Sequence, residues 1–258
     1  MSKSIYFLLI SICLGWSKTP PEATFVSSYQ KKIGHILAIH EGLVISQYSD
    51  KEIWNKLGND TYRFSSLDRG TISEVDQFTG LLTAVLLKGF NLLIVLDDRL
   101  TELVEINFNT LTPLKDIQHI AMAGANQIWL YDKVSNKLQK FDYLRKLNLI
   151  STINVIGEVI AVKSNTEFCW VMTRNELLKF NHQGGLVNKL SLDNFTDFTI
   201  GDNYLILSDE KSHFILTNQS KKPEKIFFDK MFAGSFFLQG QTLYIYDEKT
   251  IHEFQLKF

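Results

Sequence analysis

Hydrophobic and polar positions between His119 and Phe141 follow a pattern that is typical of short antiparallel strands. The apolar run His119–Ala123 leads into Gly124–Asn126, whose residues tolerate the positive φ angles of a tight hairpin. Gln127–Tyr131 is rich in β-branched and aromatic side chains, and a polar turn at Asp132–Asn136 separates it from a third, alternating run. The pattern predicts an antiparallel meander.

Similar units recur along the chain. If six residues are taken as the same hairpin turn, their spacings are about 47, 35, 41, 36 and 39 residues. These six turn residues are Gly42, Gly89, Gly124, Asn165, Gly201 and Gly240. A period near 40 residues with about four strands per unit predicts an all-β fold, a β-propeller of six four-stranded blades. The first unit is degenerate, so five or seven blades remain open.

The two ends of the chain predict how the ring closes. The last unit contains three strand-like runs, at Ser235–Leu238, Leu243–Tyr246 and Ile251–Leu256. A strand near Phe25–Tyr29 would complete this blade and hide its unpaired edge. We therefore expect a linker and closing strand at residues 18–32 and the propeller domain at 33–258.

The first 17 residues resemble a secretory signal peptide. Lys3 precedes a short apolar run, Ile5–Ile12, and Cys13, Gly15 and Ser17 are small residues near a cleavage site. A buried first strand is the alternative, and lipidation of Cys13 is a third reading, ranked below simple cleavage. No later segment is apolar enough to form a transmembrane helix. We expect an exported protein, periplasmic or associated with the outer membrane.

The net charge and the types of candidate residue mainly exclude certain functions. The net charge of −1 gives no general attraction to nucleic acid. The six histidines lack zinc-site spacing, and we expect no metal, cofactor or catalytic residue. His119 is interpreted as a core or channel histidine, Cys169 as a buried hydrophobe, and the aspartates that end strands as turn caps. These caps are Asp97, Asp132, Asp209 and Asp247.

The longest spacing predicts an inserted loop at about Asn59–Thr71. Loops on a rigid scaffold often carry binding residues, although an ordinary solvated loop is the alternative. We take this loop and one nearby aromatic as the candidate partner-binding surface. Its residues are Tyr62, Arg63, Phe64, Asp68, Arg69 and Phe90.

Two resemblances follow from these residues. The repeats resemble β-propellers in general, without the Trp-Asp signature of WD40 blades. Ile72–Asp76, Leu81-Leu82, Phe90 and Leu96-Asp97 resemble exported propeller-like proteins of Bacteroidota, although Thr79-Gly80 stands where that pattern has Asn-Pro. This resemblance implies a periplasmic protein of outer-membrane machinery, such as a plug or accessory subunit of the type 9 secretion translocon.

Two functional classes fit this fold. The first is a non-catalytic module that binds an envelope or outer-membrane protein through its loops. The second is a propeller enzyme or a binder of a small ligand, such as a glycan, in the central channel, where Asp76 and His119 would act. The inner strands read as mainly apolar, and this favours the interaction module over an enzyme.

Overall fold

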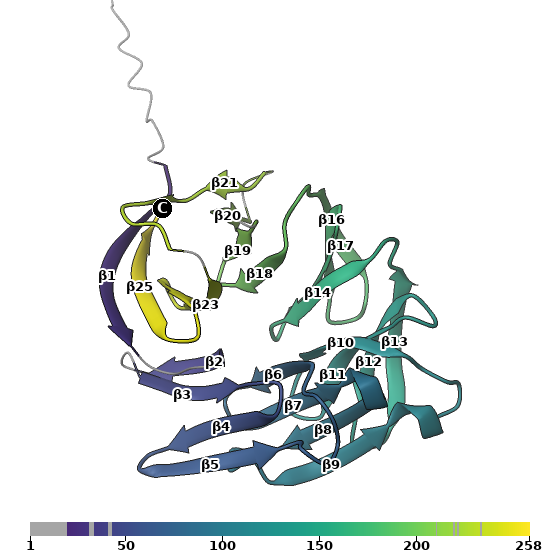
Figure 1. Cartoon of the computed structure of the whole chain (residues 1–258). Helices are drawn as coiled ribbons and strands as arrows, with labels where there is room; N and C mark the ends of the chain where they lie inside the picture. Colours follow the sequence, from purple (N-terminus) through teal and green to yellow (C-terminus); the bar gives the residue numbers. More distant parts are fainter. Residues whose placement is uncertain are drawn as a thin grey trace, which may run out of the picture.

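The strands form a ring of six sheets around a common axis (Figure 1). The computed structural model describes residues 20–30, 34–40, 43–209, 211–218, 220, 222–232 and 234–258. Five sheets are four-stranded antiparallel meanders, and the sixth is a three-stranded meander completed by an N-terminal strand, so the protein is an all-β propeller of six four-stranded blades, as the repeat predicts. Short 3-10 helices, η1 (Lys88–Phe90) and η2 (Phe108–Thr110), lie between strands of the described chain.

The first three blades follow one another along the sequence, each from its innermost to its outermost strand. Blade 1 contains β2 (His35–His40), β3 (Leu43–Tyr48), β4 (Glu52–Leu57) and β5 (Asp60–Ser65). Blade 2 contains β6 (Glu74–Phe78), β7 (Leu82–Leu87), β8 (Leu92–Leu96) and β9 (Glu102–Asn107). Blade 3 contains β10 (Ile117–Met122), β11 (Gln127–Asp132), β12 (Lys137–Asp142) and β13 (Leu147–Asn154).

The remaining blades complete the ring. Blade 4 contains β14 (Val159–Ser164), β15 (Phe168–Thr173), β16 (Glu176–Asn181) and β17 (Leu186–Ser191). Blade 5 contains β18 (Asp197–Ile200), β19 (Tyr204–Ser208), β20 (His213–Thr217) and β21 (Glu224–Lys225). Blade 6 contains β23 (Ser235–Gln239), β24 (Thr242–Tyr246), β25 (Thr250–Lys257) and β1 (Glu22–Gln30).

Ring closure by an N-terminal strand is confirmed. β1 pairs antiparallel with β25, from Glu22 opposite Lys257 to Gln30 opposite Thr250. The two-residue strand β22 (Phe227–Phe228) adds to the other edge of β1 in parallel orientation. The two termini of the propeller therefore share one sheet, and the edge that β25 would otherwise expose is covered.

The equivalence of the turns needs one correction. Gly80, not Gly89, lies in the turn between the first two strands of blade 2, the place that Gly124 takes in blade 3. Gly89 lies one turn later, within η1. With Gly89 as the turn, the apolar run Thr83–Leu87 before it would be the inner strand of blade 2; the inner strand is instead the polar segment β6.

The same error created the apparent insertion. Positions 42, 80, 124, 165, 201 and 240 in the sequence are separated by 38, 44, 41, 36 and 39 residues, so no unusually long unit falls between blades 1 and 2. An inserted loop at Asn59–Thr71 is therefore wrong for Asp60–Ser65, which form the regular outer strand β5 paired with β4 along its length. Only residues 66–73 form a connection there.

Burial follows the position of a strand within its blade. The second strands β7, β11, β15, β19 and β24 are almost wholly buried, because they have a strand on either side and a neighbouring blade on each face. The inner strands β6, β14, β18 and β23 are mostly half-buried, since their free edges face the axis. Polar side chains on these inner strands can therefore stay in contact with water near the axis.

Candidate functional site

The predicted contact residues are divided between a strand and two connections. Tyr62, Arg63 and Phe64 lie in β5, at the outer edge of blade 1. Phe64 is only 5% exposed and packs in a core cluster with Ile53, and Tyr62 packs against the same cluster. Neither aromatic residue is the exposed contact that the sequence indicated, because alternate residues of a strand point to its buried face. Phe90, in η1, is exposed as expected.

Arg69 is held by the neighbouring blade. Its guanidinium donates two hydrogen bonds to Glu102 and one, of 3.2 Å, to Glu105, both on β9. The Glu102 hydrogen bond raises the pKa of Arg69 and lowers the pKa of Glu102. Arg69 also lies 5.5 Å from the centre of the Phe64 ring. The structure thus joins Arg69 and Phe64 in one contact that fixes the 66–73 connection.

Two further predicted residues lie close to this contact, and one lies apart. Asp68 is 3.7 Å from Arg69 Nε. The backbone of Gly70 lies against the Phe90 ring, since a Cβ there would be 2.5 Å from a ring carbon. Arg63 makes a separate pair with Glu52 and lies 5.1 Å from the centre of the Trp54 ring. The predicted set therefore forms a cluster around Arg69 and Phe90 that excludes Arg63.

One face of the ring carries a series of exposed hydrophobic side chains. We call it the loop face; it is the side on which every inner strand begins, and it includes the connections between second and third strands. Five of its large side chains, from blades 1 to 4, are between 57% and 79% exposed. We call these the apolar arc: Leu67, Phe90, Leu114, Val134 and Ile156.

Hydrogen bonds join the connections that carry the apolar arc. Asn91 Nδ2 donates to the Lys115 carbonyl at 2.6 Å, which ties η1 to the connection before β10. That connection is tied in turn to the next one by a 3.0 Å bond from Asp116 N–H to Asp132 Oδ1. The Val155 N–H donates to the Asn136 carbonyl at 2.8 Å. The loop face is therefore a braced surface rather than a set of independent loops.

On the opposite face of the ring, between Leu81 and Leu144, exposed hydrophobic residues do not follow one another on successive connections. Leu81 and Leu144 are each 61% exposed there. The connections between them in sequence on that face, 97–101 and 123–126, carry no exposed large hydrophobic residue in the described range 43–209. Single exposed hydrophobic residues are common on protein surfaces, whereas a run over successive connections is a feature of binding surfaces.

The sequence interpretation missed four members of the apolar arc: Leu67, Leu114, Val134 and Ile156. They lie in connections between strands. A search for strands passes over such residues, because they belong to no periodic pattern. The usable signal was the recurrence of Leu67, Leu114 and Ile156 in the connections that lead into three successive blades.

Carboxylates on β6 cap the free edge of β10, near the ring axis. Glu74 Oε2 accepts the Ile120 N–H at 2.8 Å, and Asp76 Oδ2 accepts the Met122 N–H at 2.6 Å. Burial raises the pKa of Asp76 from 3.8 to about 6, although its side chain keeps some solvent contact inside the ring. These bonds satisfy backbone donors that have no strand partner.

His119 and Lys163 connect further blades at the same level. His119 Nδ1 is 3.2 Å from Glu74 Oε1, and its Nε2 is 3.2 Å from the Val159 carbonyl. Lys163 Nζ pairs with Asp197 at 3.0 Å. His119 is therefore the satisfied channel histidine that was predicted. The mainly apolar interior that was predicted is wrong, because charged groups of β6, β14 and β18 converge toward the axis.

Several smaller predictions are confirmed. The side chains of Asp97, Asp132, Asp209 and Asp247 accept backbone N–H bonds within their own turns. Cys169 is buried in β15, and burial raises the pKa of its thiol well above its ordinary value. The expectation of no metal stays a prediction; among the described residues no cluster of three potential metal ligands is found.

The predictions for the N-terminus concern residues outside the described part of the chain. They are the signal peptide at 1–17 and the lipidation of Cys13, and they stay predictions. Among the residues that are described, no helix is long and apolar enough to cross a membrane.

Comparisons with known proteins agree on the fold. No protein-family model and no curated protein matches the chain. A catalytically inactive virginiamycin B lyase from Staphylococcus aureus, solved with quinupristin, is 11% identical with a TM-score of 0.59, covering 82% of this chain and 78% of that one. BamB from Moraxella catarrhalis is 10% identical with a TM-score of 0.51, covering 90% and 99%.

A third solved structure is larger than this chain. PorZ, described as an essential surface component of the type IX secretion system of Porphyromonas gingivalis, is 13% identical with a TM-score of 0.50. The match covers 83% of this chain but only 32% of PorZ. At such identities these similarities establish the β-propeller fold and nothing finer.

Proposed function

We propose that the protein is a non-catalytic binding module of the bacterial cell envelope, which docks a partner protein on its loop face as an accessory or plug subunit of an outer-membrane complex. The observation that carries this proposal is the apolar arc, five exposed hydrophobic side chains on successive, mutually braced connections. Covering these side chains would bury apolar surface without a large reordering of the loops.

The surroundings of the arc also suit a protein partner. The Phe90 ring lies against Gly70, next in sequence to Arg69 and its partners Asp68 and Glu102. An apolar centre with a polar rim is the usual composition of protein interfaces. Arg69 is engaged by its own neighbours, so its role is to position the 66–73 connection, while Phe90, Leu114 and Ile156 make the contacts.

Two kinds of observation support an envelope location. The sequence of residues 1–17 has the features of an export signal. Among proteins of the same fold, PorZ is described as a surface component of a secretion system. The Bacteroidota resemblance of Ile72–Asp76 points to the same machinery, and this secretion system is accordingly the first complex in which to seek the partner.

Capture of the partner from the native envelope tests the proposal. The C-terminally tagged protein is purified after gentle solubilisation, and co-purifying proteins and the mature N-terminus are identified by mass spectrometry. The double variant Leu114→Glu/Ile156→Glu should lose a stoichiometric partner, because each glutamate places a charge in an apolar contact, and hot-spot losses of about 2 kcal/mol each weaken binding roughly 30-fold per site.

The opposite face supplies the matched control. Leu81→Glu/Leu144→Glu adds the same charge at equally exposed positions and should keep the partner. Both variants should melt like the parent protein, since all four side chains are exposed. Retention of the partner by both double variants, or a parent protein that returns alone, would contradict the docking proposal.

A further inference from the structure

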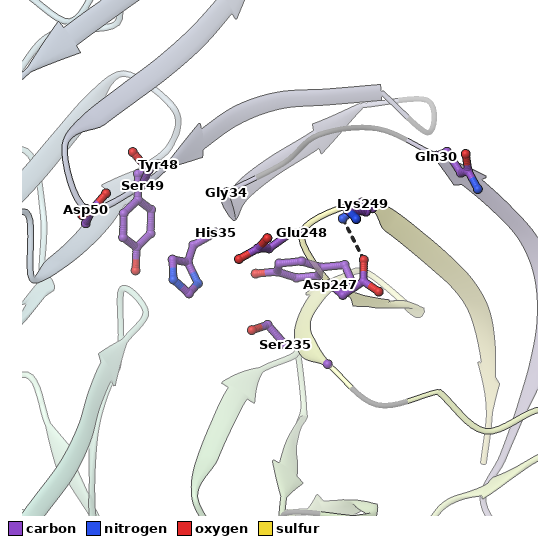
Figure 2. Close-up of a pocket in the computed structure, with 12 residues that line it drawn as sticks. Gln30, Gly34, His35, Tyr48, Ser49, Asp50, Ser235, Asp247, Glu248 and Lys249 are labelled. Carbon is purple, nitrogen blue, oxygen red and sulfur yellow. Dashed lines mark hydrogen bonds between the residues drawn. The ribbon is translucent and has the colours of Figure 1, made fainter.

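A cavity of about 1030 Å³ opens on the loop face between blades 1 and 6 (Figure 2). His35 and Tyr48 line it from blade 1, and Ser235 and Glu248 line it from blade 6. Tyr246, the last residue of β24, completes the wall. The volume lies at the upper end of the roughly 300–1,000 Å³ found for small-molecule sites.

A cavity of about 760 Å³ lies at the equivalent place between blades 4 and 5, but the lining by two tyrosines is a feature of blades 1 and 6. Tyr48 and Tyr246 occupy equivalent positions, each at the end of the second strand of its blade. The other four blades place Leu87, Asp132, Thr173 and Ser208 at that position. Blades 1 and 6 therefore supply two adjacent phenol rings where the other blades have an aliphatic or small polar side chain.

The Tyr48 and Tyr246 phenols have defined contacts and are neutral. The His35 and Tyr48 rings lie 4.9 Å apart, centre to centre, and the Tyr246 hydroxyl accepts the Ile36 N–H at 3.1 Å. Burial raises the pKa of both Tyr48 and Tyr246, so both phenols stay protonated near neutral pH. Tyr246 is only 6% exposed and packs in a core cluster with Ile36, so the half-buried Tyr48 is the phenol that presents more of its ring to the cavity.

Negative charge predominates around the cavity. Asp50, Asp247 and Glu248 line it, against a single lysine, Lys249. Behind Tyr48, the carboxylates of Glu74, Asp197 and Asp76 are close enough to raise the pKa of its phenol further. Lys163 neutralises one of these inner charges through Asp197. The cavity and the channel behind it therefore favour a positively charged occupant.

We propose that this cavity binds an organic cation, an ammonium or guanidinium group held against the Tyr48 ring and the Glu248 carboxylate, with Tyr246 behind them in the wall. Aromatic faces attract such cations, and a carboxylate adds a charge-assisted hydrogen bond. The group is carried either by a free amine or by a basic side chain of a bound peptide. The proposal is independent of the apolar arc, whose residues lie outside the cavity.

Calorimetric titration of the purified full chain tests this inference. Agmatine and putrescine represent free amines, and an acetylated, amidated Gly-Lys-Gly peptide represents a protein side chain; glucose and glutarate serve as the neutral and anionic controls. Binding of the amines and the peptide, or of the amines alone, identifies a site open to free amines. Binding of the peptide alone assigns the cavity to a protein side chain.

Two variants locate the binding. Glu248→Lys should weaken cation binding at least tenfold, because it replaces attraction with repulsion at an exposed turn, whereas Glu167→Lys on the opposite face should leave it unchanged. Tyr48→Ala should weaken it and Tyr48→Phe should largely restore it. Failure of every cation to bind, equal binding of glutarate, or no effect of Glu248→Lys would overturn the proposal.

The apolar-arc variant separates this inference from the proposed docking. Leu114→Glu/Ile156→Glu should bind the cation as the parent protein does. Loss of partner capture with intact cation binding supports both proposals, while intact capture with intact cation binding contradicts the docking alone.

Discussion

The seam between blades 2 and 3 differs from the seam between blades 6 and 1, although the same fold builds both. In the first, the carboxylates of Glu74 and Asp76 accept inner-strand N–H groups at 2.8 and 2.6 Å. In the second, the neutral groups of Tyr246 and Gln239 accept the Ile36 and Ile39 N–H groups at 3.1 and 3.3 Å. Charged acceptors make the shorter and stronger bonds.

The two seams also differ in open space. The carboxylates of β6 reach across to β10 and join the two inner strands. Blade 6 begins its inner strand with the small residue Ser235, and the large phenol of Tyr246 lies at the wall, so space remains at the mouth of the seam. The seam between blades 4 and 5 also opens into a cavity, of about 760 Å³, so the contrast concerns the two compared seams and not the whole ring.

Among the changes that test this contrast, deletion of β1 should have the largest effect on stability. Removing residues 22–30 exposes the edge of β25 and takes Ala23 and Phe25 from the core of blade 6. The lost burial and hydrogen bonds should cost at least about 5 kcal/mol, which corresponds to a fall in Tm on the order of 15 °C. Thermal unfolding followed by circular dichroism measures it.

The control for this deletion lies in the same strand. Val26 is an exposed side chain at the bulge of β1, and Val26→Ser should change the Tm little. An unchanged melting curve for the deletion variant would show that β1 does not fasten the open seam.

Loss of a charged cap should cost more than loss of a neutral one. Glu74→Ala leaves the Ile120 N–H without its acceptor and should lower the free energy of unfolding by about 1–3 kcal/mol. Gln239→Ala removes a longer bond at an exposed side chain and should cost less than about 1 kcal/mol. Urea unfolding at pH 7 compares the two variants. A larger loss of stability for Gln239→Ala would show that the seam between blades 6 and 1 is the tighter one.

The pH dependence of Asp76 gives the smallest predicted effect. Its pKa in the folded protein, about 6, lies above the ordinary 3.8, so folding favours the protonated carboxyl. Its contribution to stability is therefore complete below about pH 4 and is lost as the pH rises through 6. Relative to the parent protein, Asp76→Asn should gain about 1–2 kcal/mol between pH 4 and pH 7, because channel water reduces the full linkage value.

The free energy of unfolding of Asp76→Asn must be compared with that of the parent protein at each pH, because another buried group titrates in the same pH range. Burial lowers the pKa of His213 to about 4, so its contribution to stability is lost as the pH falls from 6.5 toward 4. This trend opposes that of Asp76 in the parent protein and cancels when Asp76→Asn is compared with it. A difference that is constant from pH 4 to pH 7 would show that the Asp76 pKa is unshifted.

The repeat could be recognised from the sequence because each blade needs the same succession of strands and turns. Hydrophobic runs such as Leu92–Leu96 mark the central strands, which are buried on both faces. The three-stranded last unit likewise indicated that β1 must complete it. Blade count and closure therefore follow from residues that repeat.

The position of the inner strands could not be predicted from hydrophobicity alone. In blade 2 the most apolar run is β7, which lies second from the axis, while β6 carries Glu74 and Asp76. An inner strand has a free edge toward solvent, and its polar side chains cap a neighbour that is 46 residues away in sequence. A pairing at that distance leaves no local pattern to detect.

The candidate surface was predicted in part for a related reason. Phe90 was placed correctly, since an aromatic residue in a polar turn after a buried strand is readily noticed. Phe64 was not, because the choice of Gly89 as the turn converted a regular strand into a loop. Leu114 and Ile156 become a surface only when the ring brings their connections onto one face.

Amide hydrogen exchange followed by NMR tests the contrast between the two seams most directly. The measurement compares the Ile36 and Ile39 amides, at the open seam, with the Ile120 and Met122 amides, at the seam closed by carboxylates. The account predicts exchange on the order of tenfold faster for Ile36 and Ile39, since a charged acceptor adds about 1 kcal/mol to a hydrogen bond. Equal rates, or faster exchange at Ile120 and Met122, would contradict it.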